Sequence, residues 1–238
     1  MTLGTLAPRR AVGSDAFGPL IEIWQTVQSS PEAVKDWYAE RWHRMISGDK
    51  SEVYAEIRDS YNARPNGADL LFLSRSCYGG VVRFRQFDGF MSTPCGPHDP
   101  ISPQSFSERV DVWHFRTRRT TFIKQDYGVA IDDALPGDLI YCDPPYSYSQ
   151  SILYGAQTFE LAQLFEMIRQ AKEKDVYVAL SIDGSKKSGD FFCDFHIPDG
   201  LFEREVMVNC GRSMLKRFQM DGQTLESEIV HDRLLLTY

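Results

Sequence analysis

The segment at positions 141–146 reads Tyr-Cys-Asp-Pro-Pro-Tyr and combines a carboxylate, two prolines and an aromatic ring. It ends the apolar run 138–142, which predicts a short buried strand. Open α/β sheets bind their ligands at the carboxyl ends of such strands. The Asp143 carboxylate and the Pro144 carbonyl can together accept both N–H bonds of an exocyclic amine on a nucleobase. That would hold the nitrogen closer to tetrahedral and aim its lone pair at an electrophile.

The prolines and the second tyrosine of this segment suit the same task. Pro144 and Pro145 restrict the backbone, and Pro144 also restricts Asp143, so the loop loses little entropy when it grips a base. The Tyr146 ring offers a stacking face worth about 1–3 kcal/mol per base. Enzymes that act on a base within a duplex first take it out of the stack, so they need such a face. The alternative is an ordinary turn, since Asp and Pro are favoured turn residues.

Other stretches of the chain match one protein family together with this motif. They lie at positions 71–84, 89–96, 122–127 and 231–238. In this combination the chain resembles the Dam-type (D12 class) DNA adenine-N6 methyltransferases, whose catalytic motif is Asp-Pro-Pro-Tyr after a strand. The resemblance runs from about Arg10 to Tyr238. The catalytic motif and the 71–84 stretch are its specific parts.

The resemblance implies transfer of a methyl group from S-adenosylmethionine to N6 of a flipped adenine in duplex DNA. Asp143 would orient the amine, Pro144 would add its carbonyl, Pro145 would stiffen the loop and Tyr146 would stack on the base. Neither a metal ion nor a covalent intermediate is expected. Relatives that methylate cytosine N4 tend to carry Ser in place of Asp143, and those acting on protein glutamine or RNA tend to carry Asn, so Asp143 favours adenine.

Acidic residues at predicted strand ends are candidates for holding S-adenosylmethionine. Asp15 ends a predicted strand, where nucleoside-binding α/β folds use an acid to accept ribose hydroxyls. Asp126 and Tyr127 match the family motif that holds the adenine of the cofactor, and Asp143 is expected to border the cofactor as well. The alternatives are a helix cap for Asp15 and a surface turn for Asp126.

The sequence pattern between positions 79 and 96, with alternating Val and Arg between glycines, predicts a β-hairpin. In the resembled family this hairpin enters DNA. Arg83 suits bidentate contact with guanine, and Tyr78 suits filling a gap in the base stack. Gly79 stands where the family often has Asn. The expected DNA-binding residues of this stretch are Tyr78, Gly79, Val81, Arg83, Arg85 and Pro94.

The chain carries a formal charge of −7, which argues against a protein that coats nucleic acid indiscriminately. Local charge differs, since five basic residues stand against one acid between positions 109 and 124. Phosphate binding needs a basic stripe on one face rather than a basic protein. Arg116, Arg118 and Arg119 are therefore further candidates for DNA contact. The alternative is a solvated surface.

With 238 residues and 42% hydrophobic content, the chain is expected to form one globular domain with an appended subdomain. Alternating strands and helices predict an α/β sheet, and the resemblance makes this a Rossmann-like methyltransferase sheet. Residues 1–30 and 119–238 are the expected catalytic domain, and 31–118 an inserted helical and hairpin-bearing recognition lobe. Predicted strands cover 10–15, 121–123, 139–142, 176–182, 205–208 and 233–237. Predicted helices cover 17–27, 31–48, 52–62, 68–76 and 158–174, and 98–107 is a predicted loop.

Several classes of protein are disfavoured. The apolar runs are too short to span a bilayer and the first residues lack a signal-peptide layout, so a cytoplasmic, nucleoid-associated protein is expected. The five cysteines contain no Cys-x-x-Cys pair and the five histidines have no metal-ligand spacing, which disfavours a disulfide framework or a zinc site. Cys77 and Cys142 are expected to pack in the core. Double-stranded DNA is the expected partner, and no membrane is.

One departure from the family concerns the cofactor. The family has, ahead of the strand that ends at Asp15, another strand with a Phe-x-Gly-x-Gly-like loop, whose glycines approach the methionine part of S-adenosylmethionine. These 238 residues contain no such motif. We therefore expect an N-terminally incomplete sheet with exposed strand edges. Three explanations remain: a late start assigned to the chain, a second chain that supplies the missing part, or a catalytically silent DNA-binding remnant.

Overall fold

The computed structural model of the chain describes residues 5–145, 159–186, 191–212 and 229–238. Contacts between residues divide it into two compact units, Met1–Tyr127 and Gly128–Tyr238, and each is described by itself. This division by contacts is of a different kind from the predicted functional division into 1–30 with 119–238 and 31–118. That functional division stays a prediction.

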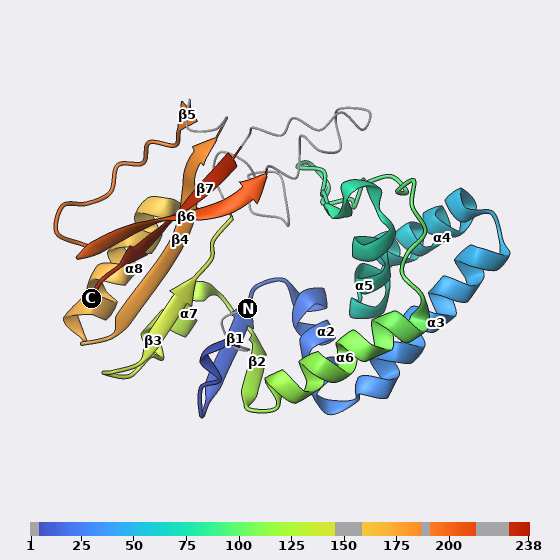
Figure 1. Cartoon of the computed structure of the whole chain (residues 1–238), viewed down its shortest axis with the longest axis horizontal. Helices are drawn as coiled ribbons and strands as arrows, with labels where there is room; N and C mark the ends of the chain where they lie inside the picture. Colours follow the sequence, from blue (N-terminus) through green and yellow to red (C-terminus); the bar gives the residue numbers. More distant parts are fainter. Residues whose placement is uncertain (1–4, 146–158, 187–190, 213–228) are drawn as a thin grey trace. The chain divides into compact units, whose positions relative to one another are not determined.

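The first unit contains a two-stranded parallel sheet of β1 (Ala11–Asp15) and β2 (Thr120–Lys124). The register runs from Ala11 opposite Thr120 to Asp15 opposite Lys124, so both strands end at the same edge. Both strands were predicted at these positions and are confirmed. The helices of this unit are α2 (Gly18–Ser29), α3 (Pro31–Ser47), α4 (Lys50–Ala63), α5 (Gly67–Ser76) and α6 (Pro103–Thr117) (Figure 1).

Side chains cap several of these helices. Asp49 accepts hydrogen bonds from two main-chain N–H groups at the start of α4, and Asn66 accepts one at the start of α5. Ser102 does the same for α6. Ser30 occupies the N-cap position of α3 as expected, but its side chain makes no capping hydrogen bond there. Pro31 at the first helical position still favours a helix start.

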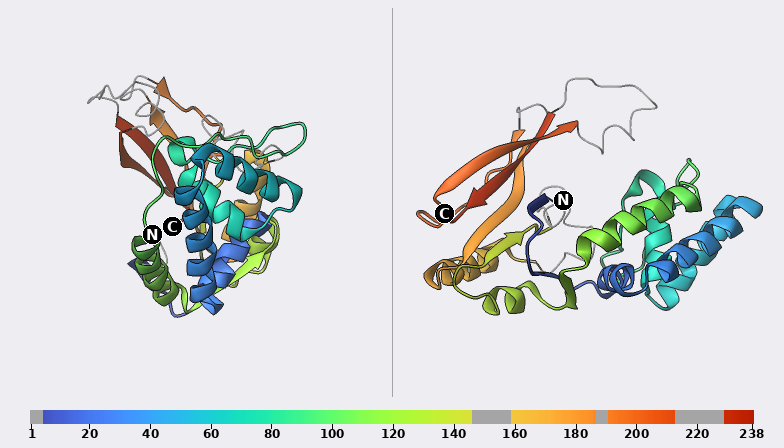
Figure 2. Two further views of the ribbon diagram at one scale, coloured as in Figure 1. Left: turned by 90° about the vertical axis from the view of Figure 1, so that its right-hand side faces the viewer. Right: turned by 60° about the horizontal axis from the view of Figure 1, so that its bottom comes forward.

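Helices α3 to α6 pack side by side around one hydrophobic core, as Figure 2 shows from two directions. Tyr38 of α3 is fully buried and stacks on Phe106 of α6, with ring centroids 4.0 Å apart. The largest fully buried side chains of this core are Tyr38, Tyr54, Phe72, Met45, Ile57, Leu73 and Met91. The core thus joins the helices to the chain segment that follows α5.

Two expectations for this unit were wrong in part. The stretch 98–107, predicted as a loop, contains the start of α6 at Pro103. The Pro- and Ser-rich composition that suggested a loop is here a helix start, with Ser102 as cap and proline in the first turn. The predicted hairpin is irregular: in the described structure it has a 3₁₀ turn, Tyr78–Gly80, and isolated bridges at Cys77–Cys95 and Phe84–Met91.

The second unit contains a five-stranded sheet in the order β3-β4-β7-β6, with β5 paired to β4. Strands β3 and β4 are parallel, whereas β7 is antiparallel to both β4 and β6. The strands are β3 (Leu139–Cys142), β4 (Tyr177–Lys186), β5 (Phe191–Phe192), β6 (Arg204–Arg212) and β7 (Ile229–Leu236). All except the two-residue β5 were predicted. The mixed α/β class is therefore confirmed.

Helix α8 (Leu161–Glu173) connects β3 to β4 and buries Leu164, Phe165 and Ile168. The helix was predicted to begin at Thr158, which lies outside the described residues, and the described helix begins at Leu161. A short helix that was not predicted, α7 (Tyr127–Asp132), begins where the two units meet in the sequence.

Candidate functional site

The motif Asp143-Pro144-Pro145 directly follows β3, at the carboxyl end of that strand. Cys142 is opposite Leu180 in the parallel pairing of β3 with β4, so the motif leaves the sheet where β4 continues beyond it. Asp143 is exposed, and both prolines are half-buried. This is the edge at which α/β sheets bind ligands. Tyr146, the fourth residue of the motif, lies outside the described residues.

Polar side chains line β4 just beyond its pairing with β3. Ser181, Asp183 and Ser185 are only 8%, 3% and 5% exposed. Ser181 and Asp183 lie on one face of the strand, and a register shift after Asp183 places Ser185 opposite His231. The Ser185 hydroxyl and Nδ1 of His231 on β7 are 3.1 Å apart. These residues were not among the predicted site residues. The sequence feature that could have indicated them is a set of small polar residues in the second half of an otherwise apolar strand.

The two residues just before Asp143 have raised pKa values. Burial raises the pKa of Tyr141, the charge of Asp143 raises it further, and a side-chain hydrogen bond with Ser181 acts in the opposite direction. Burial, with a contribution from Asp143, also raises the pKa of the Cys142 thiol to about 12. Cys142 is therefore a protonated thiol at neutral pH rather than a nucleophile. Tyr141 links Asp143 to the polar face of β4.

In the first unit, Asp15 and Asp126 lie at one edge of the β1–β2 sheet. Asp15 is opposite Lys124, and the N–H of Gln125 donates to the Asp15 carbonyl over 3.1 Å. Asp126 follows immediately. The Asp15 carboxylate accepts a hydrogen bond of 2.7 Å from the N–H of Phe17, so it also fixes the entry into α2. A carboxylate retains acceptor capacity after one such bond.

The recognition segment, defined here as residues 78–96, runs past the end of α5 as an irregular loop (Figure 1). Tyr78, Arg83, Arg85 and Pro94 are exposed on it, and Val81 is half-buried. Gly79 adopts φ +68°, a left-handed conformation that favours glycine over asparagine. Glycine at this position therefore has a conformational reason.

Buried polar residues that were not predicted from the sequence fix the recognition segment by hydrogen bonds. The hydroxyl of Thr93, which is 3% exposed, donates to the Val81 carbonyl over 2.9 Å and accepts from the Arg83 N–H over 2.8 Å. Tyr54 of α4 donates to the Thr93 carbonyl over 2.8 Å. Asn62 of α4 binds both main-chain groups of Met91. A Thr between exposed residues gives no sequence signal for such a role.

The family model for D12 class N6 adenine-specific DNA methyltransferases matches residues 2–204. The chain belongs to this family. Among its relatives, the DNA adenine methylase of Vibrio cholerae serotype O1 is 29% identical over 139 residues, which are 56% of this chain and 48% of that protein. The Type II methyltransferase M1.LlaDCHI of Lactococcus lactis subsp. cremoris is 23% identical over 209 residues, 81% of this chain and 72% of that protein.

The DNA adenine methylase of Escherichia coli (strain K12) is 25% identical over 145 residues, 55% of this chain and 50% of that protein. The chain thus spans about half the length of the Vibrio cholerae and Escherichia coli methylases that it matches. Within the ranges that the structure describes, no helix is long and apolar enough to cross a bilayer. The same ranges hold no group of three or more His, Cys, Asp or Glu side chains suited to a metal ion.

The predicted DNA-contact residues fall into two separate places in the first unit. The start of α2 lies beside the recognition segment, whereas Gln28 near the end of α2 donates to the carbonyl of Thr117, just before Arg118 and Arg119. Twelve helical residues span about 18 Å. Arg116, Arg118 and Arg119 are exposed, but they are not gathered with Arg83 and Arg85.

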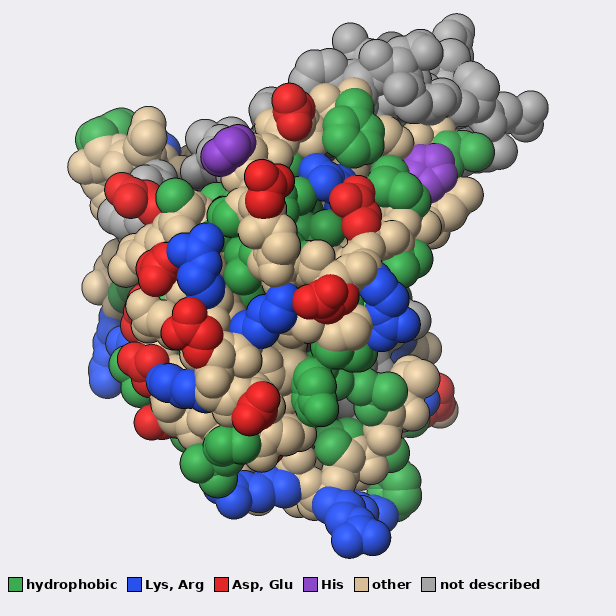
Figure 3. Space-filling view, turned by 90° about the vertical axis from the view of Figure 1, so that its left-hand side faces the viewer, with side chains coloured by type: hydrophobic (Ala, Val, Ile, Leu, Met, Phe, Trp, Pro, Cys, Tyr) green, Lys and Arg blue, Asp and Glu red, His purple; other side chains and the backbone are tan. Residues whose placement is uncertain are grey.

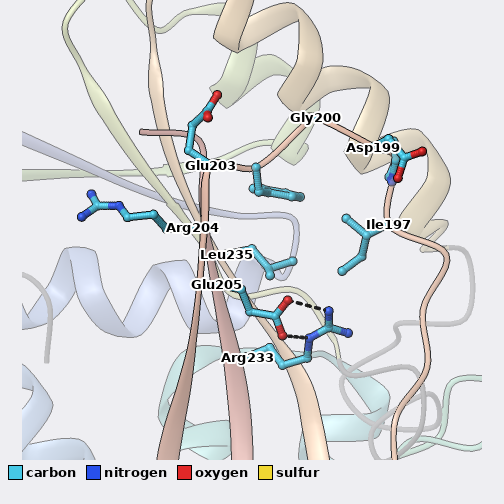
Figure 4. Close-up of a pocket in the computed structure, with 10 residues that line it drawn as sticks. Ile197, Asp199, Gly200, Glu203, Arg204, Glu205, Arg233 and Leu235 are labelled. Carbon is cyan, nitrogen blue, oxygen red and sulfur yellow. Dashed lines mark hydrogen bonds and ion pairs between the residues drawn. The ribbon is translucent and has the colours of Figure 1, made fainter.

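A pocket of about 380 Å³ opens beside β6 and β7 of the second unit (Figure 4). Glu205 and Arg233 form a two-bond pair within it, with distances of 2.7 and 3.0 Å. In the sheet order, β4 lies between β3 with its Asp143 motif and the β7 and β6 strands that line the pocket. On the face of the molecule in Figure 3, the described acidic and basic side chains are interspersed. The pocket is therefore distinct from the candidate site.

Proposed function

We propose that this chain takes part in site-specific methylation of DNA at N6 of adenine, with S-adenosylmethionine as methyl donor. The observation that carries the proposal is Asp143-Pro144 at the carboxyl end of β3, beside the parallel strand β4. Membership of the D12 class supports adenine as the target. The relatives named as DNA adenine methylases support the same reaction.

The reaction follows from the hydrogen-bonding capacity of the motif. Asp143 accepts one N–H of the flipped adenine amine and the Pro144 carbonyl accepts the other, which turns the nitrogen lone pair toward the methyl donor. S-adenosylmethionine supplies an electrophilic methyl group when it is bound. After transfer the nitrogen carries an extra proton, which Asp143 accepts and passes to water. Pro145 stiffens the loop, and Tyr146 stacks on the base.

The acids at the end of the β1–β2 sheet suit the cofactor. Asp15 has acceptor capacity for the ribose hydroxyls beyond its bond to Phe17, and Asp126 with Tyr127 would flank the adenine of the cofactor. The family's glycine loop is not among the 238 residues. We propose that a segment outside them, on a longer or a second chain, completes the pocket. A Rossmann-like sheet is part of this proposal, supported by the parallel strand pairs and the crossover helix α8.

Transfer of a radioactive methyl group from S-adenosylmethionine to unmethylated duplex DNA tests the proposal. Asp143→Ala should lower the rate at least about a hundredfold, in the range for loss of a group that stabilises the transition state. DNA affinity should change less than about twofold. Asp133→Ala, an exposed acid outside the motif, is the matched control and should keep the wild-type rate. Full activity of Asp143→Ala would mean that the site is misassigned.

Calorimetry with S-adenosylmethionine separates this proposal from a catalytically silent DNA-binding remnant. An enzyme must bind the cofactor, whereas a remnant needs only the recognition segment. If the 238-residue chain binds DNA but no cofactor at millimolar concentration, the enzymatic proposal fails for this chain alone. Cofactor binding that appears only when a polypeptide with the glycine loop is added would support completion of the pocket by a second chain.

A further inference from the structure

Phe87 is 82% exposed, more than any other large hydrophobic side chain in the described part of the chain. It lies at the tip of the recognition segment, in the turn formed by residues 85–90. Its neighbours Gln86, Asp88 and Gly89 are exposed and not apolar. A single ring in polar surroundings is too small for a stable protein–protein interface, which buries roughly 1,200 Å² or more. The exposed Phe87 ring therefore suits a partner other than a large protein surface.

The turn that carries Phe87 has a fixed shape. The Arg85 N–H donates to the Phe90 carbonyl, and the Gly89 N–H donates to the Arg85 carbonyl, both over 2.9 Å. The Asp88 carboxylate accepts from the Phe90 N–H over 3.0 Å and pairs with the Arg85 guanidinium over 2.8 Å. Gly89 adopts φ +68°, which closes the turn without strain. None of these bonds involves the Phe87 ring.

A series of cation–π contacts ties the tip to the helical unit. The Arg85 guanidinium lies 4.2 Å from the centroid of Phe90 and 5.1 Å from the centroid of Phe87. Arg58 of α4 also lies over the Phe90 ring, 5.7 Å from its centroid. Asn62 of α4 holds the next residue by two main-chain hydrogen bonds. Phe87 is thus presented on a supported tip with a positive charge beside it.

We propose that Phe87 is a wedge that inserts at a base step of duplex DNA while Arg85 contacts a neighbouring phosphate. The proposal rests on the proposed function, since it takes DNA as the partner of the recognition segment. Between positions 75 and 90, three arginines stand against one acid, which complements a polyanion. Duplex DNA places phosphates next to apolar base faces, and proteins open such steps with exposed apolar side chains. Tyr78, at the base of the segment, is a separate stacking group.

Binding of a labelled duplex, measured by fluorescence anisotropy at several salt concentrations, tests the wedge. Phe87→Ala should weaken binding about tenfold, equal to about 1.4 kcal/mol, and leave the salt dependence unchanged, because it removes no charge. Arg85→Gln should instead reduce the slope of log affinity against log salt by about 0.9, the value for one phosphate contact. Leu135→Ala, which removes a side chain 66% exposed in the second unit, is the control and should bind like the wild type.

Fluorescence of 2-aminopurine in the duplex reports unstacking directly. Wild-type protein should raise the signal at one step, Phe87→Leu should keep part of the rise, and Phe87→Ala should lose it. Thermal melts check that each variant folds, which is expected because the Phe87 ring is 82% exposed. Wild-type affinity in Phe87→Ala, or weaker binding with no change in 2-aminopurine signal, would overturn the wedge while DNA binding stands. If the wild-type chain itself does not bind duplex DNA, the proposed function fails and the wedge with it.

Discussion

The ring of Phe84 lies edge-on against the ring of Phe17, with centroids 5.7 Å apart and planes at 76°. Phe84 belongs to the recognition segment, whereas the N–H of Phe17 donates to the Asp15 carboxylate over 2.7 Å. One packed contact therefore joins the candidate DNA-reading segment to the candidate ribose-binding acid. Both lie in the same unit of the structure.

Replacing Phe84 should loosen both the recognition segment and the chain around Asp15. Phe84→Ala removes a half-buried ring that also lies 6.3 Å from the ring of Tyr61, so we expect the free energy of unfolding to fall by about 2 kcal/mol. Urea denaturation followed by tryptophan fluorescence measures this, since all four tryptophans lie in the first unit. Phe84→Leu keeps most of the apolar area and should lose less than half as much. Equal stability of the wild type, Phe84→Ala and Phe84→Leu would show that the contact between Phe84 and Phe17 does not contribute to stability.

Thr93 should be more important for stability than its side-chain size suggests. Thr93→Val keeps the shape of the side chain but leaves the Val81 carbonyl and the Arg83 N–H without their buried partner. Unsatisfied buried groups cost about 1–3 kcal/mol, so we expect a loss in that range and weaker DNA binding through a displaced Arg83. Ser92→Ala, an exposed neighbour, is the control and should change the urea midpoint little. A variant as stable as wild type would mean that water replaces the hydroxyl.

The structure of the recognition segment was only partly predicted from the sequence. Alternating Val and Arg with flanking glycines predicted a hairpin, and the pairing of Phe84 with Met91 and of Cys77 with Cys95 confirms that the two arms meet. The ladder between these bridges is irregular because the side chains of Thr93 and Asn62 take bonds that a ladder would make. Side-chain bonds of this kind depend on tertiary neighbours, which a local pattern does not contain.

Strands were predicted better than helix starts. The strands that end at Asp15 and Cys142 were predicted from short local runs with an acid at or just after their ends. The expected burial of the second strand was wrong, because Leu139 and Tyr141 are 49% and 45% exposed. Helix α6 was not predicted at all. Its Pro-rich first turn has the composition of a loop, although Phe106 and Val110 of the helix are buried in the core. The polar residues of β4 around Asp183 were not predicted as part of the site, because their position beside β3 depends on strand pairing.

A buried ion pair in the helical unit should contribute strongly to its stability. Asp69, 3% exposed, accepts from Nε of Arg41 over 2.8 Å and also from the side chains of Ser60 and Asn66. Asp69→Ala removes the buried partner of the Arg41 charge and leaves it the more exposed Glu40 at 3.7 Å, so we expect a loss of about 3–5 kcal/mol in the free energy of unfolding. The double variant Arg41→Met with Asp69→Ala should lose clearly less than the sum of the single changes.

An exposed ion pair of the same unit serves as the comparison. Arg44 and Glu56 are 2.9 Å apart, with side chains 45% and 63% exposed. Solvent screening makes such pairs weak, so Glu56→Ala should cost no more than about 1 kcal/mol in the same urea experiment. If both acids cost the same, burial does not set the strength of the Asp69 pair.

Alkaline pH should weaken the first unit. Burial raises the pKa of Tyr38 and of Tyr61 to about 12, from the ordinary value of 10. Between pH 10 and 12 the unfolded chain loses these protons while the native state keeps them, so stability falls as pH rises through this window. Below pH 10 both states are protonated and this contribution is fully present. The urea midpoint, measured by tryptophan fluorescence from pH 7 to 12, should show the fall.

Tyr61→Phe provides the control for the alkaline transition. It removes one titrating hydroxyl and leaves the ring contacts in place, so the fall between pH 10 and 12 should become shallower. Tyr38 is less suitable, because its hydroxyl also donates to the Ile101 carbonyl over 2.8 Å. An unchanged pH dependence in Tyr61→Phe would assign the alkaline transition to other groups.

Cys142 stands next to Asp143 but should take no part in the reaction. With its pKa at about 12, roughly one thiol in ten thousand is ionised at pH 8, whereas a nucleophilic cysteine needs a depressed pKa. Alkylation by iodoacetamide, followed by mass spectrometry, should modify the exposed Cys210 well before Cys142. Cys142→Ala should keep methyl transfer within about twofold, because the proposed reaction forms no bond to the thiol. Loss of transfer in a folded Cys142→Ala protein would point to a covalent step and would contradict direct transfer to the amine.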